Sequence, residues 1–211
     1  MTDYLFPTFR PHEMTDDEMR LLAAKVHDPF NWYAPNSGYD EIFSLLRGRG
    51  SSYVDLVMTT TGDVPGFLVT ELRMVGTRQV CYFVGSSFLP DIRGGGIASK
   101  LARRAITRKR YQYVAARTQN PLVYDALASL GAPGQCWPQH DGRCPPLDIS
   151  KIAQSCSNHD SFDPFTLITR DAFGHVREDR SYMRSRNPKT QAMFEDRLGP
   201  NDGFMVVASL I

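Results

Sequence analysis

Three consecutive glycines near the middle of the chain follow an apolar stretch and precede an amphipathic one. The segment reads Phe88-Leu89-Pro90-Asp91-Ile92-Arg93-Gly94-Gly95-Gly96-Ile97-Ala98-Ser99. A strand that ends at Leu89 and a helix that starts at Ile97 would leave backbone N–H groups free at the helix N-terminus, where the helix dipole adds partial positive charge. Glycine suits such a turn because a side chain would hold an anion away from the amides. The segment therefore predicts a binding site for a phosphate or diphosphate group.

Two other phosphate-binding loops do not fit this segment. A P-loop requires Gly-x-x-x-x-Gly-Lys followed by Ser or Thr, whereas the glycines here are contiguous. The dinucleotide fingerprint requires Gly-x-Gly-x-x-Gly early in a βαβ unit and an acidic residue about 20 residues later. Here the stretch after the glycines is basic. The basic side chains are Arg103, Arg104, Arg108, Lys109 and Arg110, and they form either a solvated helix face or a surface that attracts phosphates.

Two motifs in this order resemble those of the GNAT superfamily of N-acyltransferases. Arg93, Gly96 and Ala98 occupy the three fixed places of its acyl-CoA loop, Arg/Gln-x-x-Gly-x-Gly/Ala. The segment from Asn120-Pro121 to Leu130-Gly131 resembles its later element, Asn-x-x-Ala-x-x-Leu-Tyr-x-x-x-Gly. In this second segment Asn is an N-cap, Pro takes the first helical position and Gly ends the helix. The resemblance covers about residues 53–131.

The resemblance implies both a fold and a function. The fold would be α+β (α/β-like), with a mixed, mostly antiparallel central sheet, a splayed parallel strand pair and flanking helices. The function would be transfer of an acetyl or other acyl group from acyl-CoA to an amine of a small-molecule acceptor. A GNAT-fold protein that binds CoA without acyl transfer, as a sensor or interaction domain, is the alternative. The implied CoA-binding residues are Ser87, Phe88, Leu89, Arg93, Gly94, Gly95, Gly96, Ile97, Ala98, Ser99 and Asn120.

Candidate catalytic groups follow partly from the resemblance and partly from the residues. By resemblance, the backbone N–H of Leu89 would stabilise the tetrahedral oxyanion. The tyrosine that donates a proton in many GNAT enzymes falls at Leu127, which cannot donate one. Tyr124 lies three residues earlier on nearly the same helix face and either substitutes for it or packs. Glu71, an acidic residue within the predicted central strands, is either the general base or the ion-pair partner of Arg73.

The four cysteines and two of the histidines allow a further reading. Cys136, His140, Cys144, Cys156 and His159 supply enough sulfur and nitrogen ligands for a structural zinc site, although their spacing matches no standard motif. We expect no bound metal. Either histidine could also approach the acyl-transfer site from its loop.

Length and composition favour one soluble domain. We expect a single GNAT-like domain over residues 1–211, with its core at about 53–131, an irregular insertion at about 132–162 and a C-terminal strand-helix-strand at about 163–211. The net charge of +1 gives no drive toward nucleic acid. We see no run of about 18 apolar residues for a membrane span and no secretory signal in Met1–Arg20, so we expect a cytoplasmic protein. A homodimer is compatible with this reading.

Hydrophobic periodicity predicts the elements that position the turn. The first helix is capped by Thr15 and runs to about Val26. The other expected helices are Tyr39–Leu46, one beginning at Ile97, Pro121–Leu130, Ile149–Cys156 and Thr190–Leu198. The expected strands are Ser52–Thr59, Gly66–Val75, Gln79–Leu89, Tyr113–Thr118, Phe165–Thr169 and Gly203–Leu210, the last inserted into the central sheet.

Overall fold

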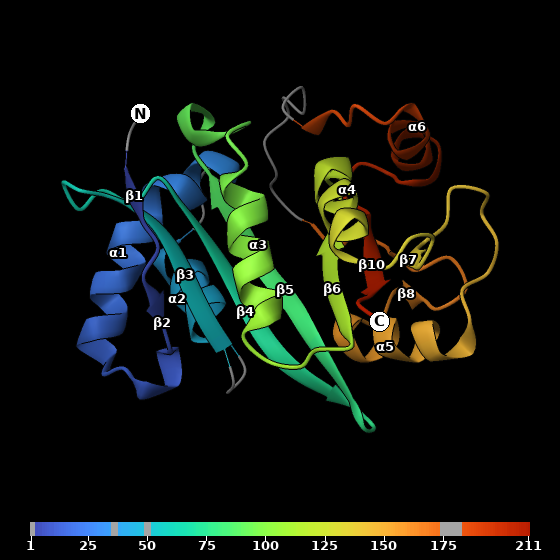
Figure 1. The fold of residues 1–211 in the computed structure, drawn as a ribbon, viewed down its shortest axis with the longest axis horizontal. Coiled ribbons are helices and arrows are strands. Elements are labelled where there is room, and N and C mark those ends of the chain that lie inside the picture. The colour runs from blue at the N-terminus through green and yellow to red at the C-terminus, as the bar shows by residue number, and fades with distance from the viewer. Residues whose placement is uncertain (1–2, 35–37, 49–51, 174–182) are drawn as a thin grey trace. The chain divides into compact units, whose positions relative to one another are not determined.

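The computed structural model describes residues 3–34, 38–48, 52–173 and 183–211 (Figure 1). The chain divides into two compact units, Met1–Leu72 with Phe83–Arg108, and Arg73–Tyr82 with Lys109–Ile211. Strands β4 (Gly66–Val75) and β5 (Arg78–Phe88) each have residues in both units. No helix in the described ranges combines the length and the apolar character that crossing a membrane requires.

The first helix of the first unit is longer than predicted. Helix α1 spans Asp16–Tyr33 and begins at a capping box, in which the Glu18 N–H donates to Thr15 Oγ1 (3.3 Å) and the Thr15 N–H donates to Glu18 Oε2 (2.8 Å). The predicted end near Val26 is wrong, because α1 continues through Pro29. Apolar burial continues past that point, since Phe30 stacks on Phe67 at 6.4 Å between ring centroids. We attribute the tolerance of the proline to this burial.

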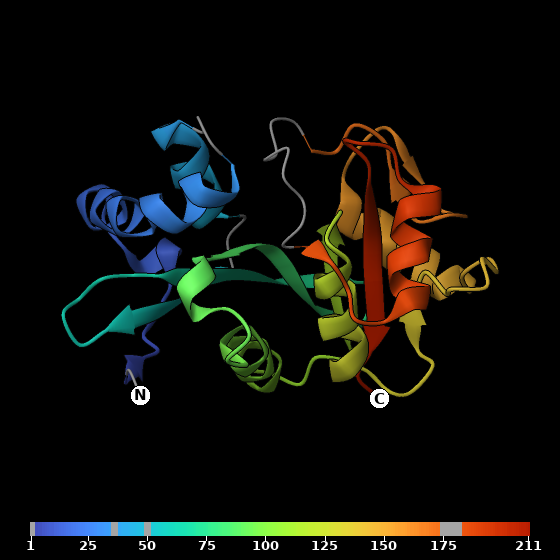
Figure 2. The ribbon, with the colours of Figure 1, turned by 90° about the horizontal axis from the view of Figure 1, so that it is seen from above.

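The strands of the first unit lie between two layers of helices. Strand β3 (Ser52–Thr59) pairs antiparallel with β4, with Val54 opposite Val69. It also pairs with the short strands β1 (Tyr4–Leu5) and β2 (Thr8–Phe9), in the order β1-β3-β4-β5 with β2 on β3. Figure 2 shows α1 and α2 (Tyr39–Arg47) on one face of these strands and α3 (Ile97–Thr107) on the other. The first face holds a core that includes Leu22, Val26, Ile42, Leu46 and Phe67.

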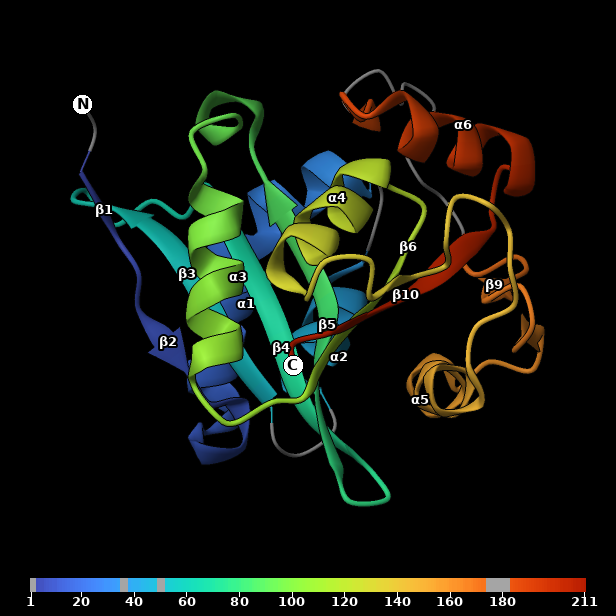
Figure 3. The ribbon, with the colours of Figure 1, turned by 45° about the vertical axis from the view of Figure 1, so that its right-hand side comes forward.

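Two short 3-10 helices complete this unit, η1 (Pro11–Glu13) and η2 (Pro90–Ile92). The second of them follows β5 directly, and the glycine turn follows it. The turn therefore sits at one end of α3, as Figure 3 shows.

The second unit is built around β10 (Gly203–Ser209), the strand predicted to join the sheet from the C-terminus. It pairs antiparallel with β6 (Tyr113–Thr118), with Val206 opposite Ala116, and the start of β5 lies beside β6 in the parallel sense. Strands β7 (Cys136–Trp137) and β9 (Ile168–Thr169) also pair with β10, and β8 (Phe162–Asp163) pairs with β9. The helices here are α4 (Pro121–Leu130), α5 (Leu147–Ser157) and α6 (Pro188–Arg197).

One predicted strand of this unit is wrong in extent. The expected strand Phe165–Thr169 is reduced to Ile168–Thr169, and Phe165 is 70% exposed. Asp163 explains the break, because its carboxylate accepts hydrogen bonds from the Phe165 N–H (2.9 Å) and from Thr166 Oγ1 (2.6 Å). A side chain that bonds the backbone in this way favours a turn over a strand.

Candidate functional site

The glycine turn presents a row of backbone amides at the start of α3. The Arg93 N–H donates to the Pro90 carbonyl (3.1 Å), and the next backbone N–H along the chain that donates to a described residue is that of Lys100, to the Gly96 carbonyl (2.9 Å). Between them, the N–H groups of residues 94–99 form no hydrogen bond with any residue that the structure describes. Gly94 and Gly96 have φ of 78° and 74°, a backbone region in which glycine is favoured. The turn is therefore held open by its own conformation.

A cavity of about 480 Å³ adjoins these amides. Helix α3 has no acidic residue in its first turn, and the Lys100 ammonium lies 4.1 Å from the Phe6 ring centroid. The Arg104 guanidinium donates to the Phe6 carbonyl and so fixes the N-terminal segment against α3. Amides, helix dipole and Lys100 together favour an anion in this cavity. Its lining residues are Asp3, Tyr4, Phe6, Asp91, Ile92, Arg93, Gly95, Gly96, Ile97 and Lys100.

Arg93 braces the turn from within. Its Nε and Nη2 atoms both donate to the Phe88 carbonyl, at 2.8 Å and 2.6 Å. The guanidinium also lies 3.8 Å from the ring centroid of Trp32 on α1. The sequence predicts Arg93 as a CoA-binding residue, and its guanidinium here contacts two protein groups that fix the path of the chain from β5 into the turn.

The predicted CoA-binding residues Ser87 and Leu89 are packed into the first unit. Ser87 is buried, and its hydroxyl donates to the Pro29 carbonyl. The Leu89 N–H donates to the Pro65 carbonyl at 2.8 Å. An N–H engaged in this way has no hydrogen left for an oxyanion, so the oxyanion donor predicted at Leu89 is not available in this structure. Gly66 makes room for the end of β5, because a Cβ there would lie 2.5 Å from Phe88 Cδ1.

Glu71, the predicted base, is buried on β4 opposite Ser52. A Cβ on Gly48, at the end of α2, would lie 3.0 Å from Glu71 Oε1, so the carboxylate faces that helix end. Glu71 is the fifth residue after Gly66, which packs against the turn, and that offset is about 16 Å along a strand. Arg73, the predicted ion-pair partner, donates to the Cys156 carbonyl (2.6 Å) and lies 3.8 Å from the Tyr82 ring centroid.

Asp55, which the sequence reasoning overlooks, forms a buried ion pair with Arg108 at the end of α3. Arg108 Nη2 donates to both carboxylate oxygens at 2.7 Å and 2.8 Å, and Thr8 Oγ1 donates to Oδ1 at 2.6 Å. The Asp55 side chain is fully buried. Arg108, one member of the predicted basic cluster, is thus paired with a buried carboxylate, whereas Arg103 is exposed.

In the second unit, Asn120 is the N-cap of α4 and Tyr124 lies in the first turn of that helix. Asn120 Oδ1 accepts from the Leu122 N–H (2.9 Å), which confirms the predicted N-cap. The Tyr124 hydroxyl donates to the Pro138 carbonyl (2.9 Å), and burial raises the pKa of Tyr124 well above its usual value. Leu127, at the position of the family's tyrosine, is fully buried. This geometry favours packing over proton donation for Tyr124.

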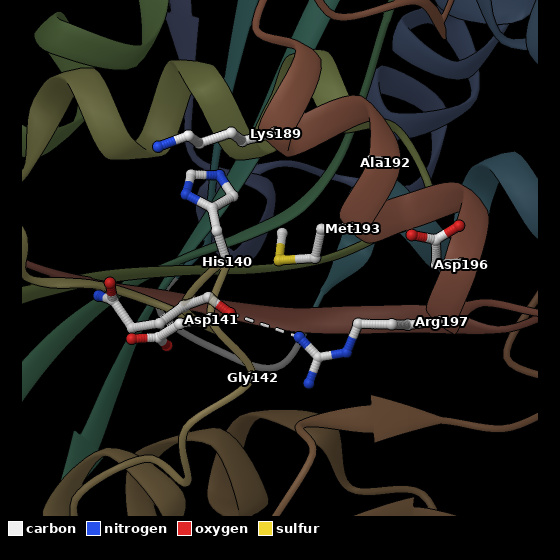
Figure 4. Close-up of a pocket in the computed structure, with 9 residues that line it drawn as sticks. His140, Asp141, Gly142, Lys189, Ala192, Met193, Asp196 and Arg197 are labelled. Atoms are coloured by element: carbon white, nitrogen blue, oxygen red, sulfur yellow. Dashed lines mark hydrogen bonds between the residues drawn. The ribbon is translucent and has the colours of Figure 1, made fainter.

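A second cavity, of about 730 Å³, adjoins His140 (Figure 4). His140 Nε2 lies 3.1 Å from Thr190 Oγ1, which in turn donates to Asp125 Oδ1 at 2.8 Å. Because the Thr190 proton goes to Asp125, His140 Nε2–H is the donor to Thr190. Burial lowers the pKa of His140, and the Lys189 charge acts in the same direction against that of Asp125. The lining residues are Gln139, His140, Asp141, Gly142, Lys189, Ala192, Met193, Asp196 and Arg197.

The residues of the zinc hypothesis do not gather. His159 Nδ1 bonds Ser161 Oγ (2.9 Å), Cys136 is buried and Cys144 is exposed. Over the described ranges, no three or more His, Cys, Asp or Glu side chains are grouped as a metal site would require.

Known structures give the class of fold. No family model matches the sequence, and no curated protein does. Tetrahymena GCN5 superposes with a TM-score of 0.51 at 10% identity, over 99% of this chain and 96% of that one. YhbS, a GNAT family N-acetyltransferase from Escherichia coli, gives 0.45 at 15% identity, over 60% and 68%. A GCN5-related glucosamine N-acetyltransferase region of a fungal multi-domain β-N-acetylglucosaminidase gives 0.44 at 18% identity, and the match covers 55% of this chain but only 14% of that chain.

The full-length superposition on GCN5 establishes the fold alone. The chain has the α+β GNAT fold, with a mixed sheet flanked by helices, as predicted.

Proposed function

We propose that this chain is a cytoplasmic acyl-CoA-dependent N-acyltransferase that moves an acetyl or other acyl group to an amine of a small-molecule acceptor. The observation that carries the proposal is the row of unbonded amides over residues 94–99, at a helix N-terminus and beside a cavity with Lys100. A diphosphate supplies the negatively charged acceptors that such a row favours. The GNAT fold makes the diphosphate of an acyl-CoA the preferred candidate.

The chemistry requires few groups from the protein. The amine nitrogen attacks the thioester carbon, a C–N bond forms, the C–S bond breaks, and the ammonium loses a proton to a base. A thiol has a pKa of about 8.5, so CoA thiolate is a tolerable leaving group without a dedicated acid. Glu71 stays the predicted base. Because the Leu89 N–H is bonded within the protein, another donor must serve the oxyanion. The Tyr124 hydroxyl, the candidate acid, donates to the Pro138 carbonyl instead.

Those same internal bonds favour the second candidate, a GNAT-fold protein that binds CoA without transferring its acyl group. A buried leucine at residue 127 and an engaged tyrosine at residue 124 leave no proton donor at this face of α4. Binding is common to both candidates, and turnover separates them.

Gly95→Asp tests the binding site with little risk to the fold. Gly95 lies outside the left-handed region, and a Cβ there would lie 3.9 Å from its nearest described neighbour, the Ile92 carbonyl oxygen. A carboxylate at this position would repel the diphosphate and compete for the amides. We expect the affinity for CoA to fall at least tenfold, since charge-assisted hydrogen bonds contribute about 1.5–3 kcal/mol each. Titration calorimetry measures the Kd.

Gly95→Ala is the matched control, because it adds the Cβ without the charge. It should keep the wild-type Tm and lose less affinity than Gly95→Asp. Equal affinity of wild type and Gly95→Asp for CoA would remove the glycine turn from the proposal. Release of free thiol from acetyl-CoA in the presence of small amines, followed with a thiol reagent, would favour the transferase. Tight CoA binding without thiol release would favour the second candidate.

A further inference from the structure

Gln119 has a buried side-chain amide for which the described part of the chain supplies no partner. The residue lies between the end of β6 at Thr118 and the N-cap of α4 at Asn120, and it is 6% exposed. Neither Oε1 nor Nε2 forms a hydrogen bond with any residue that the structure describes. Buried amides are nearly always bonded in native proteins, because an unpaired one loses its bonds to water without replacement.

The surrounding chain fixes Gln119 without bonding its side chain. The Asn120 N–H donates to Thr118 Oγ1 (2.9 Å), and Asn120 Oδ1 accepts from the Leu122 N–H (2.9 Å), so the backbone on either side is held. Phe204 is opposite Thr118 in the β6–β10 ladder, and continuing that register places Gly203 opposite Gln119. A glycine offers no side-chain partner across the ladder.

Gln112, just before the amino end of the same strand, shows the ordinary arrangement. Its side-chain Oε1 accepts from the Gln79 backbone N–H at 2.8 Å, and its backbone N–H donates to the Gln79 carbonyl at 2.9 Å. Gln112 is half-buried, and its side-chain oxygen has a partner at one end of β6. Gln119 is buried at the other end, and neither atom of its amide bonds a residue that the structure describes.

We infer that Gln119 is a ligand-positioning residue whose side-chain amide hydrogen-bonds an amide or amine group of a substrate. The carboxamide offers one acceptor and two donors side by side, which complement a ligand that carries both an N–H and a C=O. It lies at the carboxyl end of β6, the end of a strand at which ligands bind in open sheets. This inference rests on the proposed function, in which two sources supply that chemistry: the pantetheine amides of CoA and the acceptor.

A pair of methionine variants tests the inference, because methionine is unbranched, apolar and similar in length to glutamine. Gln119→Met removes an unpaired amide, so we expect the Tm of the ligand-free protein to stay equal or to rise by about 2–4 °C. Gln112→Met removes a satisfied acceptor and leaves the Gln79 N–H without it, so its Tm should fall. If the role of Gln119 were purely structural, the Tm values of both variants would fall.

Binding and turnover of the same three proteins complete the test. We expect Gln119→Met to weaken the binding of one substrate, CoA or the amine, about tenfold or more. Gln112→Met should keep the wild-type affinity for both. A higher Kd for CoA by calorimetry identifies the carrier as the source. An unchanged Kd with a higher KM for the amine identifies the acceptor.

Two results would overturn the inference: a Tm for Gln119→Met that falls as far as that of Gln112→Met, or a Kd and KM that both equal the wild-type values. A water molecule that satisfied Gln119 in place of a substrate would give the second result. Failure of the proposed function is recognised separately, because the wild-type protein itself would then bind no CoA.

Discussion

At the scale of single residues, Arg93 acts through the backbone that it holds. Its two hydrogen bonds to the Phe88 carbonyl tie the glycine turn to the end of β5, and its stacking on Trp32 ties both to α1. Only a planar guanidinium can make both contacts in this geometry, since an ammonium lacks the fork of donors and the flat face. Arg93 thus lines the cavity and also fixes the turn through two contacts within the protein.

Arg93→Lys should therefore destabilise the protein while keeping the charge. We expect the free energy of unfolding to fall by about 1–3 kcal/mol, because a charged bidentate bond and a stacking contact are lost. Urea unfolding measures the change. Arg103→Lys, at an exposed position of α3, is the control and should be neutral. If both lysine variants are equally stable, the bracing role of Arg93 is contradicted.

We expect His140 to make the stability of the protein depend on pH. Burial lowers its pKa in the folded protein, so the unfolded chain takes up the proton first as pH falls. The associated stability is complete above the unfolded pKa of about 6.5 and is lost as pH falls through the folded pKa. We expect His140→Gln to show a smaller drop in Tm between pH 7 and 5 than the wild type. An unchanged drop in His140→Gln would refute the role of His140.

At the scale of elements, α3 is fixed at both ends by arginines. Arg93 holds the turn before it, and Arg108 closes it with a buried ion pair to Asp55 on β3. Thr8 on β2 donates to the same carboxylate, so three segments of the first unit converge there. A helix held in this way presents its N-terminal amides at a fixed angle, which a diphosphate site requires.

Breaking this ion pair from one side should be severe. Asp55→Ala leaves the Arg108 charge without its partner, and we expect the free energy of unfolding to fall by about 3–5 kcal/mol. The double variant Asp55→Leu with Arg108→Met removes both charges and should recover most of that loss. Urea unfolding of the single and double variants gives the comparison. Additive losses in the double variant would show that the two charges do not interact.

At the scale of the whole molecule, the local pattern predicted most elements but few tertiary contacts. Strands β3, β4 and β6 and helix α4 begin and end where turn and cap residues indicate, since Gly62, Gly76 and Asn120 act locally. The extension of α1 through Pro29 could not be predicted in this way. It depends on Phe67, a residue of a later strand.

The features of the candidate site also differ in whether local sequence or tertiary contacts determine them. The open amides of the turn were predictable, because contiguous glycines before an amphipathic helix act through their own backbone. Three contacts were not predictable from the sequence. The Leu89 N–H donates to the Pro65 carbonyl, and the Arg93 guanidinium lies over the Trp32 ring. The Tyr124 hydroxyl donates to the Pro138 carbonyl. The unsatisfied amide of Gln119 likewise appears only once the neighbouring strand is in place.

The likeness to GCN5 is a likeness of the whole fold, because it covers 99% of this chain at only 10% sequence identity. Layers of helices on a sheet depend on the periodicity of apolar residues, and many sequences satisfy one periodicity. The shared fold therefore does not decide the chemistry, for which the residues of the turn must be tested.

Nuclear magnetic resonance of protein labelled with 15N-glycine tests the central claim most directly. On titration with CoA, the amide protons of Gly94, Gly95 and Gly96 should move downfield as they bond the diphosphate, and inorganic pyrophosphate should move the same three. Gly62 and Gly134, which also have positive φ but lie in other turns, should stay in place. Binding of CoA that leaves the three glycine amides unmoved would contradict the claim.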